Sequence, residues 1–283
     1  MRGHEFSGTV VDSNGVAGVS EGDPVVVEPL LSCGKCWACR HGHPHVCSSL
    51  RLIGIDVDGA AAEYVSVPAE KLHPTPQGLS LRDAALAEPL SVAVHMVRRS
   101  AAGLGDRVIV LGGGPIGALV AFVCRDVGVA EVVISEPNES RRGLLASMGL
   151  EALNLDGDDL TTVLSRTDGE GFDAVFELAG VEATMLQATD LARVRGTILL
   201  GALPGTPVAA RVASAVTKEQ NITGSRVYES RDMEHALRIL AAGRIPSEEL
   251  VTREVGLTEA IPRAYEALRT RRDEMKILLT NEG

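Results

Sequence analysis

Aromatic residues are scarce in this sequence. Phe, Trp and Tyr make up only 3% of its 283 residues, although 45% of the residues are hydrophobic. A chain of this length can bury a large core, which must therefore consist mainly of Ala, Val, Leu and Ile. With 23% charged residues, the composition is that of an ordinary globular protein, and the length favours two domains.

Long apolar runs, a leader pattern and an excess of basic residues are also missing. No apolar run approaches the ~18 residues of a membrane span, so we expect no membrane partner. Residues 1–5 lack the pattern of a signal peptide, and we expect a cytoplasmic protein. The net charge of −11 excludes a general affinity for nucleic acid, because basic residues supply most of that binding.

Cysteine is rare but clustered. Four of the five cysteines fall within 15 positions, as Cys33, Cys36, Cys39 and Cys47. A disulfide knot is disfavoured in a long chain without a leader, because cytoplasmic thiols stay reduced. The spacing instead suits four thiolates that close tetrahedrally on one zinc ion, and such a closed site is structural and not catalytic.

Other candidate ligands lie in the same loop. His41, His43 and His45 are interleaved with the cysteines, but with four thiolates available we interpret all three as solvated loop residues. Cys124 lies among apolar residues, and we interpret it as a small core hydrophobe.

The secondary-structure pattern changes near residue 91. Before it the chain is mostly β, with expected strands at 6–11, 25–27 and 61–67, and a helix beginning at 80–82. After it, strands and helices alternate, which predicts a parallel sheet with helices on both faces. The expected strands are 107–111, 131–135, 151–154, 174–177, 197–200, 221–223 and 275–279, and the expected helices are 115–127, 140–148, 160–165, 182–191, 233–242 and 259–269.

A glycine pattern follows the first strand of the alternating part. Gly112, Gly114 and Gly117 have Gly-x-Gly-x-x-Gly spacing between a strand pattern and a helix pattern. In a dinucleotide site the first glycine permits the turn, the second lets the backbone approach the pyrophosphate, and the third lets helix pack on strand. Glu136 ends the next strand, near the spacing expected for a carboxylate that binds the adenosine ribose.

This carboxylate bears on the choice of cofactor. Glu136 favours NAD over NADP because it would repel a 2′-phosphate, and the nearby Arg141 and Arg142 weaken that preference. The loops after residues 177 and 200 should lie at the same edge of the sheet, although ordinary turns remain an alternative for both. The candidate cofactor-binding residues are Gly112, Gly114, Pro115, Ile116, Gly117, Glu136, Arg141, Ala179, Gly201, Ala202 and Leu203.

Several motifs together resemble one family. They are Gly-His-Glu-Phe-Ser-Gly at 3–8, the four-cysteine lobe at 32–49, Glu-Pro-Leu-Ser-Val-Ala-Val-His at 88–95 and the glycine loop. The chain resembles the zinc-dependent medium-chain dehydrogenase/reductase (alcohol dehydrogenase) family, in the branch of sorbitol, threonine and butanediol dehydrogenases. The resemblance implies an α/β chain: a partial GroES-like β domain over 1–89, a doubly wound Rossmann domain over 90–228, and a return to the β domain over 229–283.

The resemblance also implies an activity and a set of site residues. It implies a zinc-dependent, NAD-linked oxidoreductase that moves hydride between a secondary alcohol or polyol and nicotinamide, in a homodimer or homotetramer. His4 would bind the catalytic zinc, and Glu5 and Glu88 would be further carboxylates of that site. No short motif identifies the alcohol.

One departure opens alternatives. The family's cysteine ligand of the catalytic zinc lies upstream of the Gly-His-Glu motif, which here begins at residue 3. We therefore interpret the chain as N-terminally truncated, through either a wrongly chosen start codon or a real loss. A catalytically impaired remnant that binds NAD and zinc is the main alternative. A zinc-free quinone reductase is disfavoured by the cysteine lobe.

Overall fold

The computed structural model describes residues 2–155, 160–267 and 274–281. These residues form two compact units. Unit 1 comprises the described residues up to Val92 and those from Arg226 onward, except Glu274 and Met275, which join Ala93–Ser225 in unit 2.

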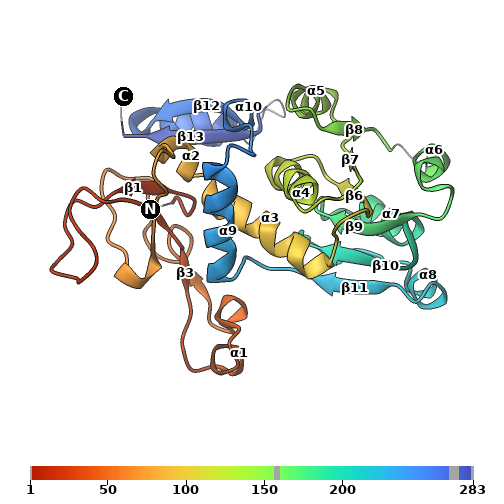
Figure 1. Cartoon of the computed structure of the whole chain (residues 1–283), viewed down its shortest axis with the longest axis horizontal. Coiled ribbons are helices and arrows are strands. Elements are labelled where there is room, and N and C mark those ends of the chain that lie inside the picture. The colour runs from red at the N-terminus through yellow and green to blue at the C-terminus, as the bar shows by residue number, and fades with distance from the viewer. Residues whose placement is uncertain (1, 156–159, 268–273, 282–283) are drawn as a thin grey trace. The chain divides into compact units, whose positions relative to one another are not determined.

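A six-stranded parallel sheet forms the centre of unit 2 (Figure 1). Its order is β11-β10-β9-β6-β7-β8, so the direction of winding reverses between β6 and β9, as in a doubly wound nucleotide-binding fold. The strands are β6 (Arg107–Leu111), β7 (Glu131–Ser135), β8 (Glu151–Leu153), β9 (Phe172–Glu177), β10 (Ala192–Leu200) and β11 (Asn221–Gly224).

Helices connect these strands. Because parallel crossovers are right-handed, α4 and α5 cover one face of the sheet, and α6 and α7 cover the other. Local signals explain two of the helix starts: Pro115 follows the N-cap Gly114, and the Asn138 side chain accepts a hydrogen bond from Arg141 N at 2.9 Å. The helices are α3 (Ala87–Ser100), α4 (Pro115–Asp126), α5 (Glu139–Ser147), α6 (Leu160–Leu164), α7 (Glu182–Leu191) and α8 (Val212–Thr217).

The core of unit 2 has the composition expected from the sequence. Val108, Ile109, Val110 and Leu111 of β6 are fully buried, which confirms a strand covered on both faces. Cys124 is also fully buried, and burial raises the pKa of its thiol far above the usual range, as expected of a core residue.

Unit 1 is built from short strands. Strands β1 (Ser7–Thr9), β2 (Pro24–Val27) and β5 (Leu72–Pro74) form an antiparallel sheet, β3 (Leu30–Leu31) pairs with β4 (Arg51–Leu52), and β12 (Val251–Gly256) runs parallel to β13 (Lys276–Thr280). Its α-helices are α1 (Trp37–Arg40), α2 (Leu81–Ala84), α9 (Ser230–Ala241) and α10 (Ser247–Leu250). Three-residue helical turns occur in the two units at Pro44–Val46, Ala69–Lys71, Ser165–Thr167 and Leu257–Glu259, and a short π-helix spans Ile261–Tyr265.

Some expectations for unit 1 were wrong. Residues 61–67 alternate like a strand, but none of the described strands pairs with them, and Tyr64 is 66% exposed. An alternating pattern yields a strand only where a partner can complete the hydrogen-bond ladder. Strand β12 was missed, and the end of the helix expected over 259–269 lies outside the described residues. Within the ranges that the structure describes, no helix has both the length and the apolar character needed to cross a bilayer.

A buried carboxylate links distant parts of unit 1. Glu28, directly after β2, is 6% exposed and accepts hydrogen bonds from Lys71 Nζ at 2.8 Å and Ser230 Oγ at 2.6 Å. His73 Nε2 lies 3.4 Å from its second oxygen. Burial by itself would raise the pKa of Glu28, but His73, Lys71 and Ser230 together lower it to about 2. Glu28 thus connects the sheet to the start of α9.

We expect this carboxylate to make unit 1 sensitive to acid. Because the pKa of Glu28 is lowered from 4.5 to about 2, its stabilisation is complete above pH 4.5 and is lost as the pH falls toward 2. Glu28→Gln should lower the thermal midpoint near neutral pH by roughly 4–8 °C, which corresponds to about 2 kcal/mol. It should also flatten the pH dependence of the midpoint in this window, as measured by circular dichroism.

The matched control is Glu254→Gln. Glu254 pairs with Arg82 at 2.5 Å, but its side chain is 44% exposed, so its loss should change the midpoint little. Equal effects of the two substitutions would contradict a special role for Glu28.

Candidate active site

The glycine loop joins β6 to α4, and each glycine has the constraint that its position predicts. Gly112 has φ +114°, and a Cβ there would lie 3.1 Å from Ala179 N. A Cβ on Gly117 would lie 2.0 Å from the carbonyl oxygen of Gly112, so only glycine permits this packing. Gly114, the N-cap of α4, has no heavy atom within 4 Å of an added Cβ. The space beside it is open for a ligand.

Glu136 lies directly beside this loop. It is 3% exposed, and its carboxylate accepts hydrogen bonds from Gly113 N at 3.1 Å and Asn138 N at 2.9 Å. Arg141 Nη1 is 3.2 Å from the same carboxylate, and Arg142 donates to the Glu136 carbonyl at 3.0 Å. Glu136 and Arg141, which we expected to have opposite effects on the choice between NAD and NADP, therefore form an ion pair.

Two further loops meet the glycine loop at the carboxyl ends of the strands. Leu178 N donates to Leu111 O at 2.9 Å, and an added Cβ on Gly180 would lie 3.1 Å from the Ala202 Cβ. Ala179 and Leu203 are exposed, the latter by 90%. The structure thus brings all three predicted loops together at one edge of the sheet, as parallel topology requires.

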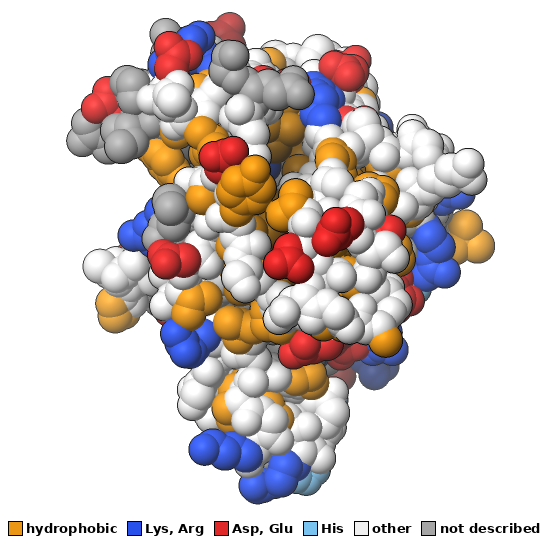
Figure 2. Space-filling model, turned by 90° about the vertical axis from the view of Figure 1, so that its left-hand side faces the viewer, with side chains coloured by type: hydrophobic (Ala, Val, Ile, Leu, Met, Phe, Trp, Pro, Cys, Tyr) orange, Lys and Arg blue, Asp and Glu red, His pale blue; other side chains and the backbone are white. Residues whose placement is uncertain are grey.

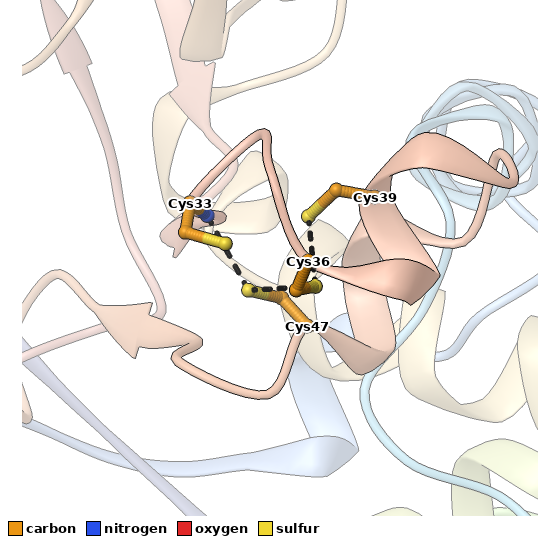
Figure 3. Close-up of side chains that lie close together, drawn as sticks. All are labelled: Cys33, Cys36, Cys39 and Cys47. Atoms are coloured by element: carbon orange, nitrogen blue, oxygen red, sulfur yellow. Dashed lines mark hydrogen bonds between the residues drawn. The ribbon is translucent and has the colours of Figure 1, made fainter.

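The four cysteines form a compact sulfur cluster in unit 1 (Figure 3). Their Sγ atoms all lie within 4.8 Å of one another, with Cys36 at 3.5 Å from Cys39 and 3.8 Å from Cys47. These separations are far longer than the ~2.05 Å of a disulfide. They match the ~3.8 Å edge of a tetrahedron with bonds of about 2.3 Å to a central zinc.

The surroundings favour a thiolate at Cys36, whereas burial and the neighbouring thiols raise the pKa of Cys39 to about 11 in the absence of a metal. Backbone hydrogen bonds at Cys39 and Ser48 lower the pKa of Cys36 to about 5, and the amides of Cys33 and Ser49 donate to Cys47 Sγ at 3.3 Å. Residues 29–55 contain no Asp or Glu, and in Figure 2 this lobe, at the bottom, carries Lys, Arg and His side chains. The donor set therefore fits a structural zinc ion.

The histidines of the lobe lie outside the described groups with metal-binding geometry. His41 is exposed, stacks on Trp37 with ring centroids 4.2 Å apart, and lies 2.7 Å from the Trp37 carbonyl oxygen. His43 is exposed as expected, but the expectation was wrong for His45, which is only 8% exposed. Its helical turn, Pro44–Val46, directs His45 inward, with an edge-on contact to His43 at 6.2 Å.

A second candidate metal group brings together residues that are more than 80 positions apart in the sequence. The ligand atoms of His4, Glu5 and Glu88 lie within 4.8 Å of one another, and His4 Nε2 is 3.8 Å from Glu5 Oε1. Backbone packing fixes the segment that carries His4: Ala60 N donates to Gly3 O at 3.0 Å, and a Cβ on Gly54 would lie 2.1 Å from that oxygen. Glu88 is in the first turn of α3.

Burial tunes the charges in this group. It raises the pKa of Glu88 to about 8, an effect that the neighbouring Tyr228 hydroxyl partly opposes. Burial, and to a lesser extent the charge of Lys276, lowers the pKa of His4, which favours the neutral imidazole that binds metal. The donor types and the neutral imidazole of His4 therefore fit a zinc ion, whose charge would favour the ionised form of Glu88.

Two residues of this group were missed in the sequence. Lys276 in β13 makes an ion pair with Glu5, and burial lowers the pKa of this lysine to about 8. Tyr228 is fully buried next to Glu88. In the sequence, the only indication of a role for Lys276 is that it is a single charge within an apolar strand. Nothing in the sequence around Tyr228 indicates a role for that residue.

Comparisons with known proteins agree with this geometry. Residues 1–77 match the model of the alcohol dehydrogenase GroES-like domain, and residues 115–242 match that of the zinc-binding dehydrogenase. A 2-dehydro-3-deoxy-L-galactonate 5-dehydrogenase of Pseudoalteromonas atlantica is 41% identical over 88% of this chain and 74% of its own length. A sorbitol dehydrogenase of Halalkalibacterium halodurans is 34% identical over 98% of this chain and 82% of its own length.

A solved structure agrees as well. It is a putative zinc-binding dehydrogenase from Sinorhizobium meliloti bound to NADP, with a TM-score of 0.90 and 31% identity over 98% of this chain and 82% of that one. The α/β architecture, the GroES-like part and the resemblance expected from the sequence are thereby confirmed. The chain belongs to the zinc-binding alcohol dehydrogenase family, whose members are zinc-dependent oxidoreductases.

Proposed function

We propose that this chain oxidises a secondary alcohol or polyol with NAD, at a site that contains His4, Glu5 and Glu88. The observation that carries the proposal is the convergence of these three donors within 4.8 Å. A zinc ion held there would polarise the alcohol oxygen as a Lewis acid. The three loops around Gly112 would bind the dinucleotide that accepts the hydride.

The chain's own residues would prepare this site. Lys276 holds the Glu5 carboxylate by an ion pair and so limits its orientation toward His4. Tyr228 lies against Glu88 in a fully buried position, from which water is excluded. The ion pair of Lys276 restricts a ligand before a metal binds, which is the usual role of residues behind a metal site.

Glu136 supports NAD as the cofactor. A buried carboxylate that lies 3.1 Å from Gly113 N would bind ribose hydroxyls and repel a 2′-phosphate. Arg141 offsets part of that repulsion, and the Sinorhizobium relative binds NADP. We therefore expect a preference for NAD and not an absolute selection.

A second candidate function rests on the donor set. His4, Glu5 and Glu88 supply no thiolate, and one oxygen of Glu5 is already paired with Lys276. An impaired chain that binds NAD and a structural zinc but does not turn over would have these features.

The cellular setting and assembly are part of the proposal. The sulfur geometry of Cys36, Cys39 and Cys47 suits a reducing compartment, which supports a cytoplasmic location. The family resemblance supports a homodimer or homotetramer.

We expect turnover to separate the two candidate functions. His4→Ala should lower NADH production by at least about 100-fold, because a Lewis acid contributes several kcal/mol to such a reaction. The substrates to test are sorbitol, butanediol, L-threonine and 2-dehydro-3-deoxy-L-galactonate. The control His235→Ala changes an exposed histidine of α9 and should have little effect. No turnover by the wild type with any of these substrates, while NADH still binds, would favour the impaired chain.

We expect one tightly held zinc ion per chain. Four thiolates bind zinc far more tightly than one imidazole and two carboxylates, so zinc at His4 should be lost on dialysis. Cys36→Ser should remove the retained zinc, as measured by atomic absorption, whereas Cys124→Ala should not. Two zinc ions retained per wild-type chain would contradict this account.

The glycine loop offers a matched pair of variants. Gly117→Ala should destabilise unit 2 by about 3 kcal/mol, because its Cβ would overlap the Gly112 carbonyl oxygen. Gly114→Ala has room in the fold and should keep the thermal midpoint, but it should weaken NADH binding about tenfold or more by blocking the pyrophosphate. Unchanged NADH affinity in Gly114→Ala, by calorimetry, would argue against a pyrophosphate at this loop.

A further inference from the structure

Glu177 is the last residue of β9, at the point where the winding of the sheet reverses. It is 1% exposed, and its Oε1 accepts hydrogen bonds from Ala179 N at 3.1 Å, Gly180 N at 2.8 Å and Thr184 Oγ1 at 2.7 Å. Thr184 lies in the first turn of α7. The side chain therefore fixes the whole loop between β9 and α7.

The backbone of the same residue fixes a second loop. Its carbonyl oxygen accepts hydrogen bonds from Gly201 N at 3.0 Å and Ala202 N at 3.3 Å, directly after β10. A Cβ on Gly201 would lie 2.5 Å from the Leu178 Cδ2, so the two loops pack closely. One buried residue thus shapes two adjacent loops at the carboxyl edge of the sheet.

The sheet order indicates which half of the dinucleotide these loops would face. In a doubly wound sheet each half binds one mononucleotide, and the halves meet where the order reverses. Glu136, the ribose candidate, directly follows β7 and assigns the β6-β7-β8 half to adenosine. The β9-β10-β11 half, which contains Glu177, is left for the nicotinamide mononucleotide.

We propose that Glu177 is a positioning residue for the nicotinamide half of the cofactor. This inference rests on the proposed function, since it requires a nicotinamide dinucleotide. Three donors share one carboxylate oxygen, so the loop that carries the exposed Ala179 is set before the cofactor binds. Without the carboxylate this loop would have to be ordered on binding, which would weaken the affinity for the cofactor.

Three variants and two ligands test the inference by calorimetry. Glu177→Ala removes the acceptor, whereas Glu177→Gln keeps a neutral acceptor oxygen that can take the place of Oε1. Glu131→Ala is the matched control. Glu131 is the first residue of β7, so it lies at the amino ends of the strands, away from the cofactor loops, and it accepts a hydrogen bond from Arg166 Nε at 2.7 Å. The ligands are NADH and ADP-ribose, which lacks the nicotinamide.

Glu177→Ala should weaken NADH binding about tenfold and ADP-ribose binding less than about threefold. Glu177→Gln should restore NADH binding, and Glu131→Ala should lower the thermal midpoint without a change in NADH affinity.

A merely structural role would weaken the binding of both ligands alike in Glu177→Ala, and that result would overturn the inference. Unchanged NADH affinity in Glu177→Ala, or no rescue by Glu177→Gln, would overturn it too. If the wild type binds ADP-ribose and NADH equally well, the nicotinamide subsite fails, and if it binds neither, the proposed function fails with it.

Discussion

A carboxylate taken out of water must find donors or a cation, or else it takes up a proton, because the uncompensated charge costs too much free energy. This constraint explains the placement of four buried glutamates: Glu28, Glu88, Glu136 and Glu177. Three of them end or follow strands: Glu136 and Glu177 accept hydrogen bonds from backbone amides of the turn, and Glu28 accepts them from side chains. The fourth, Glu88, has too few donors, and burial raises its pKa to about 8.

The different solutions match different tasks. Glu28 is paired with Lys71 and Ser230, and it holds elements of unit 1 that are more than 200 residues apart in sequence. Glu136 and Glu177 accept backbone amides and so shape loops rather than join distant elements. The poorly compensated Glu88 lies where a cation is expected, beside His4 and Glu5. The one of these four carboxylates whose charge is poorly compensated by protein groups therefore lies in the candidate metal site.

Steric limits on the backbone are the second constraint on both units. Gly117 packs so closely on Gly112 that no side chain fits, and Gly54 packs equally closely on the carbonyl oxygen of Gly3. The first contact aligns α4 with β6 at the nucleotide loop. The second fixes the segment that carries His4. In each case the position of a functional segment depends on a glycine, because the Cβ of any other residue would overlap a backbone oxygen.

The sequence by itself determined the features that depend on local pattern. The strands at β6 and β7, the helix at α7, the glycine loop and the cysteine cluster could all be predicted, because apolar period, turn chemistry and ligand spacing are encoded in adjacent residues. Only the tertiary structure decided the roles of Lys276, Tyr228 and Glu177. Their partners are distant in sequence or are backbone amides, which no pattern displays. The same reason explains two of the errors: residues 61–67 have no strand partner among the described residues, and His45 is buried by packing that its neighbours in sequence do not reveal.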